Sequence, residues 1–184
     1  RASGYPNDYA ILSYDYHTAL TSYGEAREQY GLLNILHLFI NDFGEQLAAM
    51  EYVPSENKVV PNDLCSLRYA MRSNGKSGFV FVNHYQRLAR TEDISDVEIA
   101  ACGVKFPAVD VCGDVSFIMP FNLEMSGNTL EYATAQLLCR IDNTYFFAEI
   151  GGITPQYKLN GNVYTISAGG TREIDGTRIA TISW

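Results

Sequence analysis

The clearest hydrophobic pattern in the chain runs through residues 24–50. Large apolar side chains recur there at steps of three and four, which places them on one face of a helix. They are Leu33, Leu36, Ile40, Phe43 and Leu47, and the face is widened by Leu32, Ile35 and Phe39. Thr21 or Ser22 is placed to cap this helix, with Glu25 behind for a capping box. The pattern predicts one long amphipathic helix that must bury its apolar face.

A strand-like segment precedes the helix. Residues 10–16 read Ala-Ile-Leu-Ser-Tyr-Asp-Tyr and lead almost directly into the helical pattern. A strand that feeds a helix is half of a βα unit, and a parallel strand needs sheet neighbours. The rest of the chain offers no matching βα unit. We therefore expect residues 1–50 to be a remnant of a larger barrel or doubly wound sheet.

A break in the pattern follows the helix. Pro54 and Pro61 bracket a polar run, and helix propensity falls sharply between them. This composition predicts a linker over residues 51–61. The next domain is then expected to cover residues 62–184.

Residues 62–184 carry the signals of an antiparallel β domain. Three dipeptides separate strand-like runs: Asn74-Gly75, Asn160-Gly161 and Asp175-Gly176. Each can adopt positive φ at both positions, as type I′ hairpins require. Further strands are predicted at residues 97–101, 115–120, 130–141 and 145–149. The predicted fold class is α+β and mainly β, with one long N-terminal amphipathic helix followed by an antiparallel β-sandwich-like domain.

Charge and hydropathy limit the partners. The formal net charge is −8, which argues against nucleic acid and anionic membranes. No run reaches the roughly 18 apolar residues that a membrane-spanning helix needs. Thirteen tyrosines and nine phenylalanines favour strands and carbohydrate-type surfaces.

The four cysteines inform on the compartment. They lie at positions 65, 102, 112 and 139, without a Cys-x-x-Cys pair. This spacing predicts reduced, mostly buried thiols and no zinc knuckle. We expect a cytoplasmic protein, the alternative being a secreted one whose signal peptide lies upstream of the chain.

Familiar catalytic motifs are absent from the sequence. It contains no Gly-x-Ser-x-Gly elbow, no Walker A loop and no His-Glu-x-x-His motif. A metal site of His84 with Cys102 and Cys112 has no support in the spacing. Three glutamates, at 124, 131 and 149, are candidates for a pair of catalytic carboxylates. The sequence does not place any two of them side by side, so we predict a catalytic role for none. We predict no metal and no cofactor.

The segment Ser13-Tyr14-Asp15-Tyr16 is the best candidate for ligand contact. At the C-terminal end of a barrel strand, side chains point into the mouth of the active site. Tyr14 and Tyr16 share one side of such a strand. A tyrosine there can stack on a sugar ring and donate its hydroxyl proton. The alternative is that both are core or interface aromatics.

These residues resemble the last βα unit of the catalytic barrel in family 35 glycoside hydrolases, the β-galactosidases. Ser-Tyr-Asp-Tyr is followed here by Leu20, Gly24 and a helix start near Glu28-Gln29-Tyr30, as in that family. His17 and Ala19 depart from the family pattern. Further segments resemble the β domain that follows the barrel, namely residues 74–84, 116–123, 130–136, 145–149 and 152–155.

The resemblance implies a retaining glycosidase as the parent protein. Its two catalytic glutamates would lie about 5–5.5 Å apart. In the family they lie on barrel strands 4 and 7, and the acid/base follows an asparagine. This chain has no Asn-Glu dipeptide, so the resemblance implies that no catalytic residue lies in it. Residues 1–50 would be strand 8 and helix 8 of a (β/α)8 barrel.

The implied function is that of a non-catalytic segment of a β-galactosidase-like hydrolase. The parent would hydrolyse terminal β-galactosides without a cofactor. Tyr14 and Tyr16 would line the galactose subsite, and Tyr16 is the better candidate. The alternative is a stand-alone β-sandwich that acts as a carbohydrate-binding or structural module.

The expected partners follow from both lines of argument. A β-galactoside would bind through the parent barrel, whereas nucleic acid and membranes are not expected. The apolar helix face predicts either a homo-oligomer or packing of the helix on its own β domain.

Overall fold

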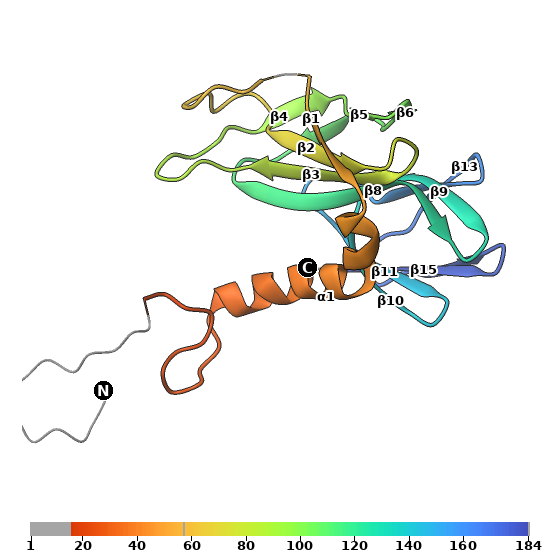
Figure 1. Cartoon of the computed structure of the whole chain (residues 1–184), viewed down its shortest axis with the longest axis horizontal. Coiled ribbons are helices and arrows are strands. Elements are labelled where there is room, and N and C mark those ends of the chain that lie inside the picture. Colours follow the sequence, from red (N-terminus) through yellow and green to blue (C-terminus); the bar gives the residue numbers. More distant parts are fainter. Residues whose placement is uncertain (1–15, 57, 184) are drawn as a thin grey trace, which may run out of the picture. The chain divides into compact units, whose positions relative to one another are not determined.

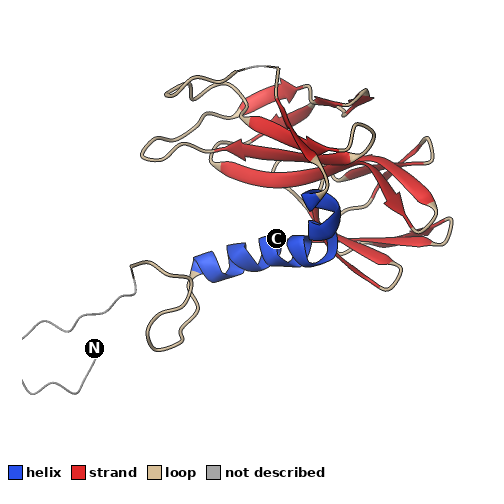
Figure 2. Cartoon of the chain, in the orientation of Figure 1, coloured by secondary structure: helices blue, strands red, loops and turns tan. Residues whose placement is uncertain are grey.

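A computed structural model describes residues 16–56 and 58–183 of the chain (Figure 1). It contains one long helix followed by antiparallel sheets packed together (Figure 2). The predicted class, α+β and mainly β, is confirmed. Two compact units divide the chain, Arg1–Leu38 and Phe39–Trp184.

The helix α1 covers Glu28–Ala48 and begins later than the predicted residue 24. The predicted cap at Thr21 is wrong. Its hydroxyl accepts hydrogen bonds from the backbone N–H groups of Tyr23, at 3.3 Å, and Glu25, at 3.1 Å. These bonds close a turn ahead of the helix, where Leu20 and Ala26 form an isolated bridge.

The boundary between the two units lies inside α1, whereas the sequence placed it after residue 50. Its position has a simple cause. Phe39 and Phe43 are buried in the core of the β unit. The last turns of the helix thus belong to the β fold.

Most of the strands are short. In chain order they are β1 (Glu51–Pro54), β2 (Tyr69–Ser73), β3 (Gly78–His84), β4 (Ile94–Val97), β5 (Ala100–Ala101), β6 (Val104–Lys105), β7 (Val109–Val111), β8 (Val115–Met125), β9 (Asn128–Ala133), β10 (Gln136–Ile141), β11 (Thr144–Ala148), β12 (Gln156–Leu159), β13 (Asn162–Thr165), β14 (Thr171–Ile174) and β15 (Thr177–Ile182). The linker prediction is wrong for residues 51–54, because β1 pairs with β2 along its whole length.

Two larger sheets carry the fold. The first has seven strands in the order β1-β2-β3-β8-β9-β12-β13, all antiparallel. The second has four strands in the order β10-β11-β15-β14, and its β11–β15 pair is parallel. Two small sheets, β4–β7 and β5–β6, complete the described strands.

Buried side chains form two hydrophobic cores. Core 1 joins the seven-stranded sheet, the four-stranded sheet and the end of α1. Core 2 joins the other face of the seven-stranded sheet to residues of β5 and β7 and to the loop that holds Phe106. Strand β3 shows how the seven-stranded sheet contributes to both cores, because Phe79 lies in core 1 while Val80 and Val82 lie in core 2. Alternation along a strand sends successive side chains to opposite faces.

Along the long strand β8, the odd-numbered side chains change from one core to the other halfway along its length. Phe117, Met119 and Phe121 lie in core 2, whereas Leu123 and Met125 lie in core 1. The intervening residue, Asn122, has a φ of 46° and lies in the left-handed region. Its side-chain amide donates a hydrogen bond to the Lys76 carbonyl oxygen at 2.8 Å. This kink interrupts the period of two and moves the odd-numbered side chains of β8 from core 2 to core 1, whereas Ile118, ahead of the kink, reaches core 1 by ordinary alternation.

The turns match two of the three predicted type I′ hairpins. Asn160-Gly161 and Asp175-Gly176 have positive φ at both positions. Asn74 does not, and the prediction of a type I′ turn there is wrong. Its carboxamide oxygen instead accepts hydrogen bonds from the N–H groups of Lys76 and Ser77 in a longer loop. Two further pairs with positive φ, Cys102-Gly103 and Ser126-Gly127, join β5 to β6 and β8 to β9.

Candidate functional site

The tyrosines predicted to contact a sugar are only partly covered by the structure. Tyr14, with most of the predicted strand 10–16, lies outside the described residues. Tyr16 is described and lies in a turn, with a φ of 25° and 77% of its surface exposed. Because Tyr14 lies outside the described residues, a galactose subsite formed by the two tyrosines stays a prediction.

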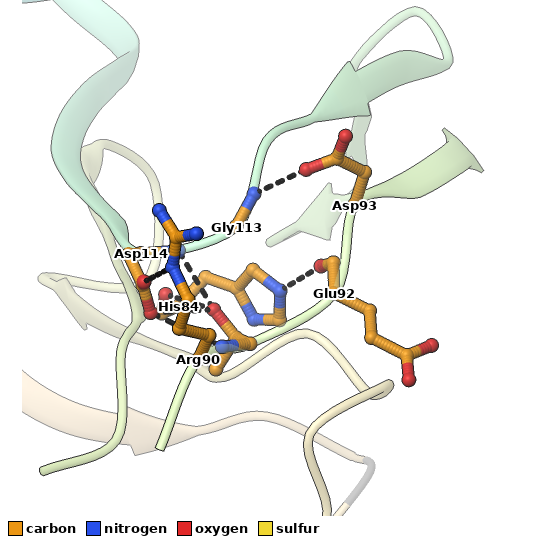
Figure 3. Close-up of polar contacts among 7 residues, drawn as sticks. His84, Arg90, Glu92, Asp93, Gly113 and Asp114 are labelled. Carbon is orange, nitrogen blue, oxygen red and sulfur yellow. Dashed lines mark hydrogen bonds and ion pairs between the residues drawn. The ribbon is translucent and has the colours of Figure 1, made fainter. Parts of the chain in front are cut away.

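A polar cluster lies where β3 ends and β8 begins (Figure 3). His84, the last residue of β3, is fully buried. Its Nε2 atom lies 2.6 Å from the backbone oxygen of Glu92, so this nitrogen carries the proton and donates it. The other ring nitrogen, Nδ1, is buried and has no partner among the described residues. The histidine thus ties the loop after β3 to the sheet.

Thr91 and Asp114 close the same cluster. The Thr91 hydroxyl donates to the backbone oxygen of His84 at 2.9 Å and accepts from the Asp114 N–H at 2.7 Å. The Asp114 carboxylate accepts from the Thr91 N–H at 3.1 Å and lies 3.6 Å from the Arg90 guanidinium. A Cβ on Gly113 would lie 2.1 Å from the Thr91 backbone oxygen, so only glycine fits there. These contacts point to a structural clamp between two loops.

The clamp also sets the charge state of Asp114. Its hydrogen bonds with Thr91, the backbone bond above all, hold the pKa of Asp114 below the usual 3.8, and Arg90 adds to this effect. A carboxyl group with a depressed pKa stabilises the fold above its unfolded-state pKa. That contribution is lost as the pH falls through the folded-state pKa.

Replacing Asp114 with asparagine should therefore flatten the acid limb of the stability profile. We expect urea midpoints of the wild type to fall as the pH drops below 3.8, and those of Asp114→Asn to fall less. The matched control is Asp142→Asn, because Asp142 also has a positive φ of 53° and its side chain forms no hydrogen bond in the described structure. Equal acid sensitivity of Asp114→Asn and wild type would contradict the role given to this carboxylate.

The cysteines do not form a metal site in the described structure. Cys102 lies 3.3 Å from the Ser73 hydroxyl, whereas Cys112 donates to the Gly151 carbonyl oxygen at 3.7 Å. Among the described residues no group of three or more His, Cys, Asp or Glu side chains is placed to hold a metal ion. His84 is occupied by the loop clamp rather than brought to either thiol.

All four cysteines are free, but the prediction that they are mostly buried is wrong. Cys65 and Cys102 are exposed, and the other two are half-buried. The Cys65 thiol donates a hydrogen bond to the Glu92 carboxylate at 3.4 Å. This bond, together with the negative charge, raises the pKa of Cys65 and disfavours the reactive thiolate.

The acidic candidates have structural partners. The Glu131 carboxylate pairs with the Lys158 ammonium at 2.6 Å and accepts from the Gly161 N–H at 2.7 Å, and the Lys158 bond holds the Glu131 pKa below its usual value. Glu124 accepts from the Gly127 N–H at 3.0 Å in the β8–β9 turn. Both carboxylates stabilise turns.

A pocket of about 280 Å³ lies beside β1 and the start of β2. Its lining residues are Tyr52, Pro54, Ser55, Lys58, Val59, Arg68 and Tyr69. The guanidinium of Arg68 is oriented by Nη2, which donates to the Asp63 backbone oxygen and, at 2.8 Å, to the Gln86 side chain. Its Nη1 atom is buried and has no acceptor among the described residues.

Sequence reasoning missed this pocket. Lys58 fell within the predicted linker, and Arg68 was not singled out. The one available signal was a cluster of cationic and aromatic residues around a segment that is otherwise rich in prolines and polar residues. Only the pairing of β1 with β2 brings Tyr52 and Pro54 beside Tyr69 and Arg68.

Comparison with known proteins assigns no family to the chain. No family model matches it, and the comparison with curated proteins also finds no match. No helix in the described part of the chain is long and apolar enough to cross a membrane.

Proposed function

We propose that this chain is a non-catalytic segment of a β-galactosidase-like retaining glycoside hydrolase. The proposal rests on the resemblance of its segments to family 35 enzymes. Four of these segments form the framework of the β unit, because they supply β3, much of β8, β9 and β11. Their side chains fill both hydrophobic cores. The resemblance therefore lies in the segments that build the fold, which supports the proposal.

The observation that carries the proposal is an apolar helix stripe that is covered only along part of its length. In the C-terminal half of α1, Phe39 and Phe43 are 0% and 6% exposed. One and two turns earlier on the same stripe, Leu36 and Leu32 are 40% and 54% exposed. Steps of three and four residues keep all four on one face. An exposed run of large apolar residues marks a surface that another protein segment covers.

The remainder of a catalytic barrel is the occupant we propose for this surface. Tyr30, Leu33 and Leu38 are also exposed, so apolar side chains surround much of the N-terminal half of this helix, and Ile40 is exposed just beyond it. A helix with such a surface is typical of one that packs among neighbours rather than at the edge of a small domain. Helix 8 of a barrel has neighbours of this kind.

In this proposal the reaction belongs to the parent protein. Two glutamates on other barrel strands would act as nucleophile and as acid/base through a covalent galactosyl intermediate. Tyr14 and Tyr16 would line the galactose subsite by stacking and by hydroxyl donation. The β unit, anchored on α1 by Phe39 and Phe43, would buttress the barrel. No cofactor takes part.

An activity comparison tests the proposal. The 184-residue chain alone should not hydrolyse p-nitrophenyl β-galactoside, because it lacks both catalytic glutamates. The native protein, captured from its source cells with an antibody against this chain, should hydrolyse it and should be several times larger than 20.5 kDa. The p-nitrophenyl α-galactoside is the matched control substrate and should not be cleaved.

Two results would overturn the proposal. The first is a native protein of 20.5 kDa without galactosidase activity, which would favour a stand-alone carbohydrate-binding or structural module. The second is hydrolysis by the isolated chain. A second copy of the chain could also cover the helix face. Light scattering on the isolated chain tests this alternative, since a second copy would give a dimer.

A further inference from the structure

The pocket beside β1 has features that the proposed function does not use. We propose that it binds a small organic anion of monosaccharide size, held by Arg68 and Lys58. The anionic group is a carboxylate or a phosphate, and the organic part lies against Tyr52. This site belongs to the β unit and does not depend on whether the chain derives from a glycosidase.

The first argument is the uncompensated charge of Arg68. Arginine is rarely removed from water unless it is paired with a carboxylate. Arg68 is partly buried, yet it forms no ion pair with any described carboxylate. Its two hydrogen bonds go to neutral oxygens, those of the Asp63 backbone and the Gln86 side chain. The guanidinium therefore keeps its full positive charge at the wall of the pocket.

The neighbouring carboxylate does not fill this role. The Asp63 side chain accepts hydrogen bonds from the N–H groups of Cys65 and Ser66, both at 3.0 Å. The Ser66 side chain lowers the pKa of Asp63 most, the two backbone bonds lower it further, and the charge of Arg68 is the smallest contribution to that shift. Asp63 thus caps a turn, and its backbone oxygen rather than its carboxylate meets the guanidinium.

The guanidinium is also held in a fixed plane. Gln86 accepts from Arg68 Nη2, and its own amide donates to the Asn62 side chain at 2.9 Å. Asn62 has a φ of 70° and donates its backbone N–H back to Gln86. A preorganised guanidinium loses little freedom when it binds an anion. The Nη1 atom is buried and has no acceptor within the described chain, so the two hydrogen bonds that orient the guanidinium both come from Nη2.

Lys58 adds a second cation at the same pocket. It is exposed and forms no ion pair among the described residues. Two unpaired cations around one pocket stand out in a chain with a net charge of −8. An acidic residue, Glu56, is exposed in the same segment. Burial raises the pKa of Tyr69, and the negative charge of Glu56 adds to this effect. Its repulsion on a bound anion is screened by solvent.

Size and shape restrict the organic part of the ligand. The pocket volume of about 280 Å³ lies just below the range of about 300–1,000 Å³ typical of drug-sized ligands. Tyr52 lines the pocket and exposes 62% of its surface, so its ring face is free to stack on a sugar ring. A single acidic sugar combines these requirements. Galacturonate is a suitable probe because it differs from galactose mainly in its carboxylate.

The test is an NMR titration of the 184-residue chain with galacturonate, with galactose as the neutral control. We expect saturable shifts at Tyr52, Lys58, Arg68 and Tyr69 with galacturonate, and none with galactose. Affinity should fall as sodium chloride is raised, because the contacts are ionic. Lys58→Gln should weaken binding about fivefold, and Lys76→Gln, an exposed lysine outside the pocket, should leave it unchanged.

Arg68→Met gives the larger expected loss, about tenfold or more, but it also removes two structural hydrogen bonds. Lys58→Gln removes none in the described structure, so it keeps the test valid if Arg68→Met unfolds. Equal binding of galactose, or unchanged affinity of Lys58→Gln, would overturn the proposal. Inorganic phosphate that binds as tightly as galacturonate would overturn the role of Tyr52. Glucose 6-phosphate that outcompetes galacturonate would support the site and identify phosphate as its anionic group.

Discussion

Replacing Phe39 with alanine should lower the free energy of unfolding by about 3–5 kcal/mol, the usual cost of removing a buried aromatic ring. Phe39 is fully buried and packs, with Phe43, in core 1 of the β unit. Its ring lies 5.1 Å from that of Phe79 in an edge-on arrangement and 5.6 Å from that of Phe43. Truncation would leave a cavity where the helix meets the sheet. Urea denaturation followed by circular dichroism measures the loss.

Leu36→Ala is the matched control. Leu36 lies one turn earlier on the same helix stripe but is 40% exposed. Substitutions at such surface positions usually change stability by about 0.5 kcal/mol or less. Alanine is also the best helix former, so the helix itself is not weakened. Equal losses for the two variants would show that the isolated chain covers Leu36, and would remove the main support for a missing barrel.

Replacing Gly78 with alanine should be nearly as damaging, with a loss of about 3 kcal/mol or more from overpacking. A Cβ at this position would lie 2.2 Å from the backbone oxygen of Arg72 and 2.7 Å from the Phe121 ring. The first contact is with backbone in the paired strand β2, which cannot rotate away. The second is with a fully buried ring in β8. Glycine is required here because two neighbouring strands approach its Cα closely.

Gly151→Ala serves as the control for this substitution. A Cβ at Gly151 meets no atom within 4 Å, and its φ is not in the left-handed region. Alanine there should be neutral or slightly stabilising, since it restricts the unfolded chain. Thermal unfolding by calorimetry compares the two variants under one condition. A Gly78→Ala protein as stable as Gly151→Ala would mean that the β2–β3 hairpin adjusts its backbone freely.

The sequence was most informative where local physics decides the structure. The period of 3.6 residues predicted α1, and two Asn-Gly or Asp-Gly pairs predicted turns that have positive φ at both positions. It failed where tertiary contacts decide. Pro54 suggested a linker, yet a proline is tolerated in β1 because that strand lies at the edge of its sheet. The turn at Ser126-Gly127 was missed because serine seldom adopts positive φ unless the paired strands impose it.

The same limit applies to the candidate sites. Tyr14 and Tyr16 were proposed from a local motif, which needs no knowledge of the fold. The anion site proposed around Arg68 depends instead on the absence of a carboxylate partner among the described residues. Such an absence is visible only once the side chains are placed. The clamp of His84 with Thr91 and Asp114 likewise joins residues from separate loops. No periodicity in the sequence predicts which threonine will meet which aspartate.

The kink at Asn122 has a consequence for how the protein loses its structure. Because β8 contributes large side chains to both cores, neither core can release this strand without exposing the other. A local opening confined to one layer is then not available at low cost. The β unit should melt as a single cooperative transition, and hydrogen exchange in β3 and β9 should report the same opening free energy on either side of the strand they share.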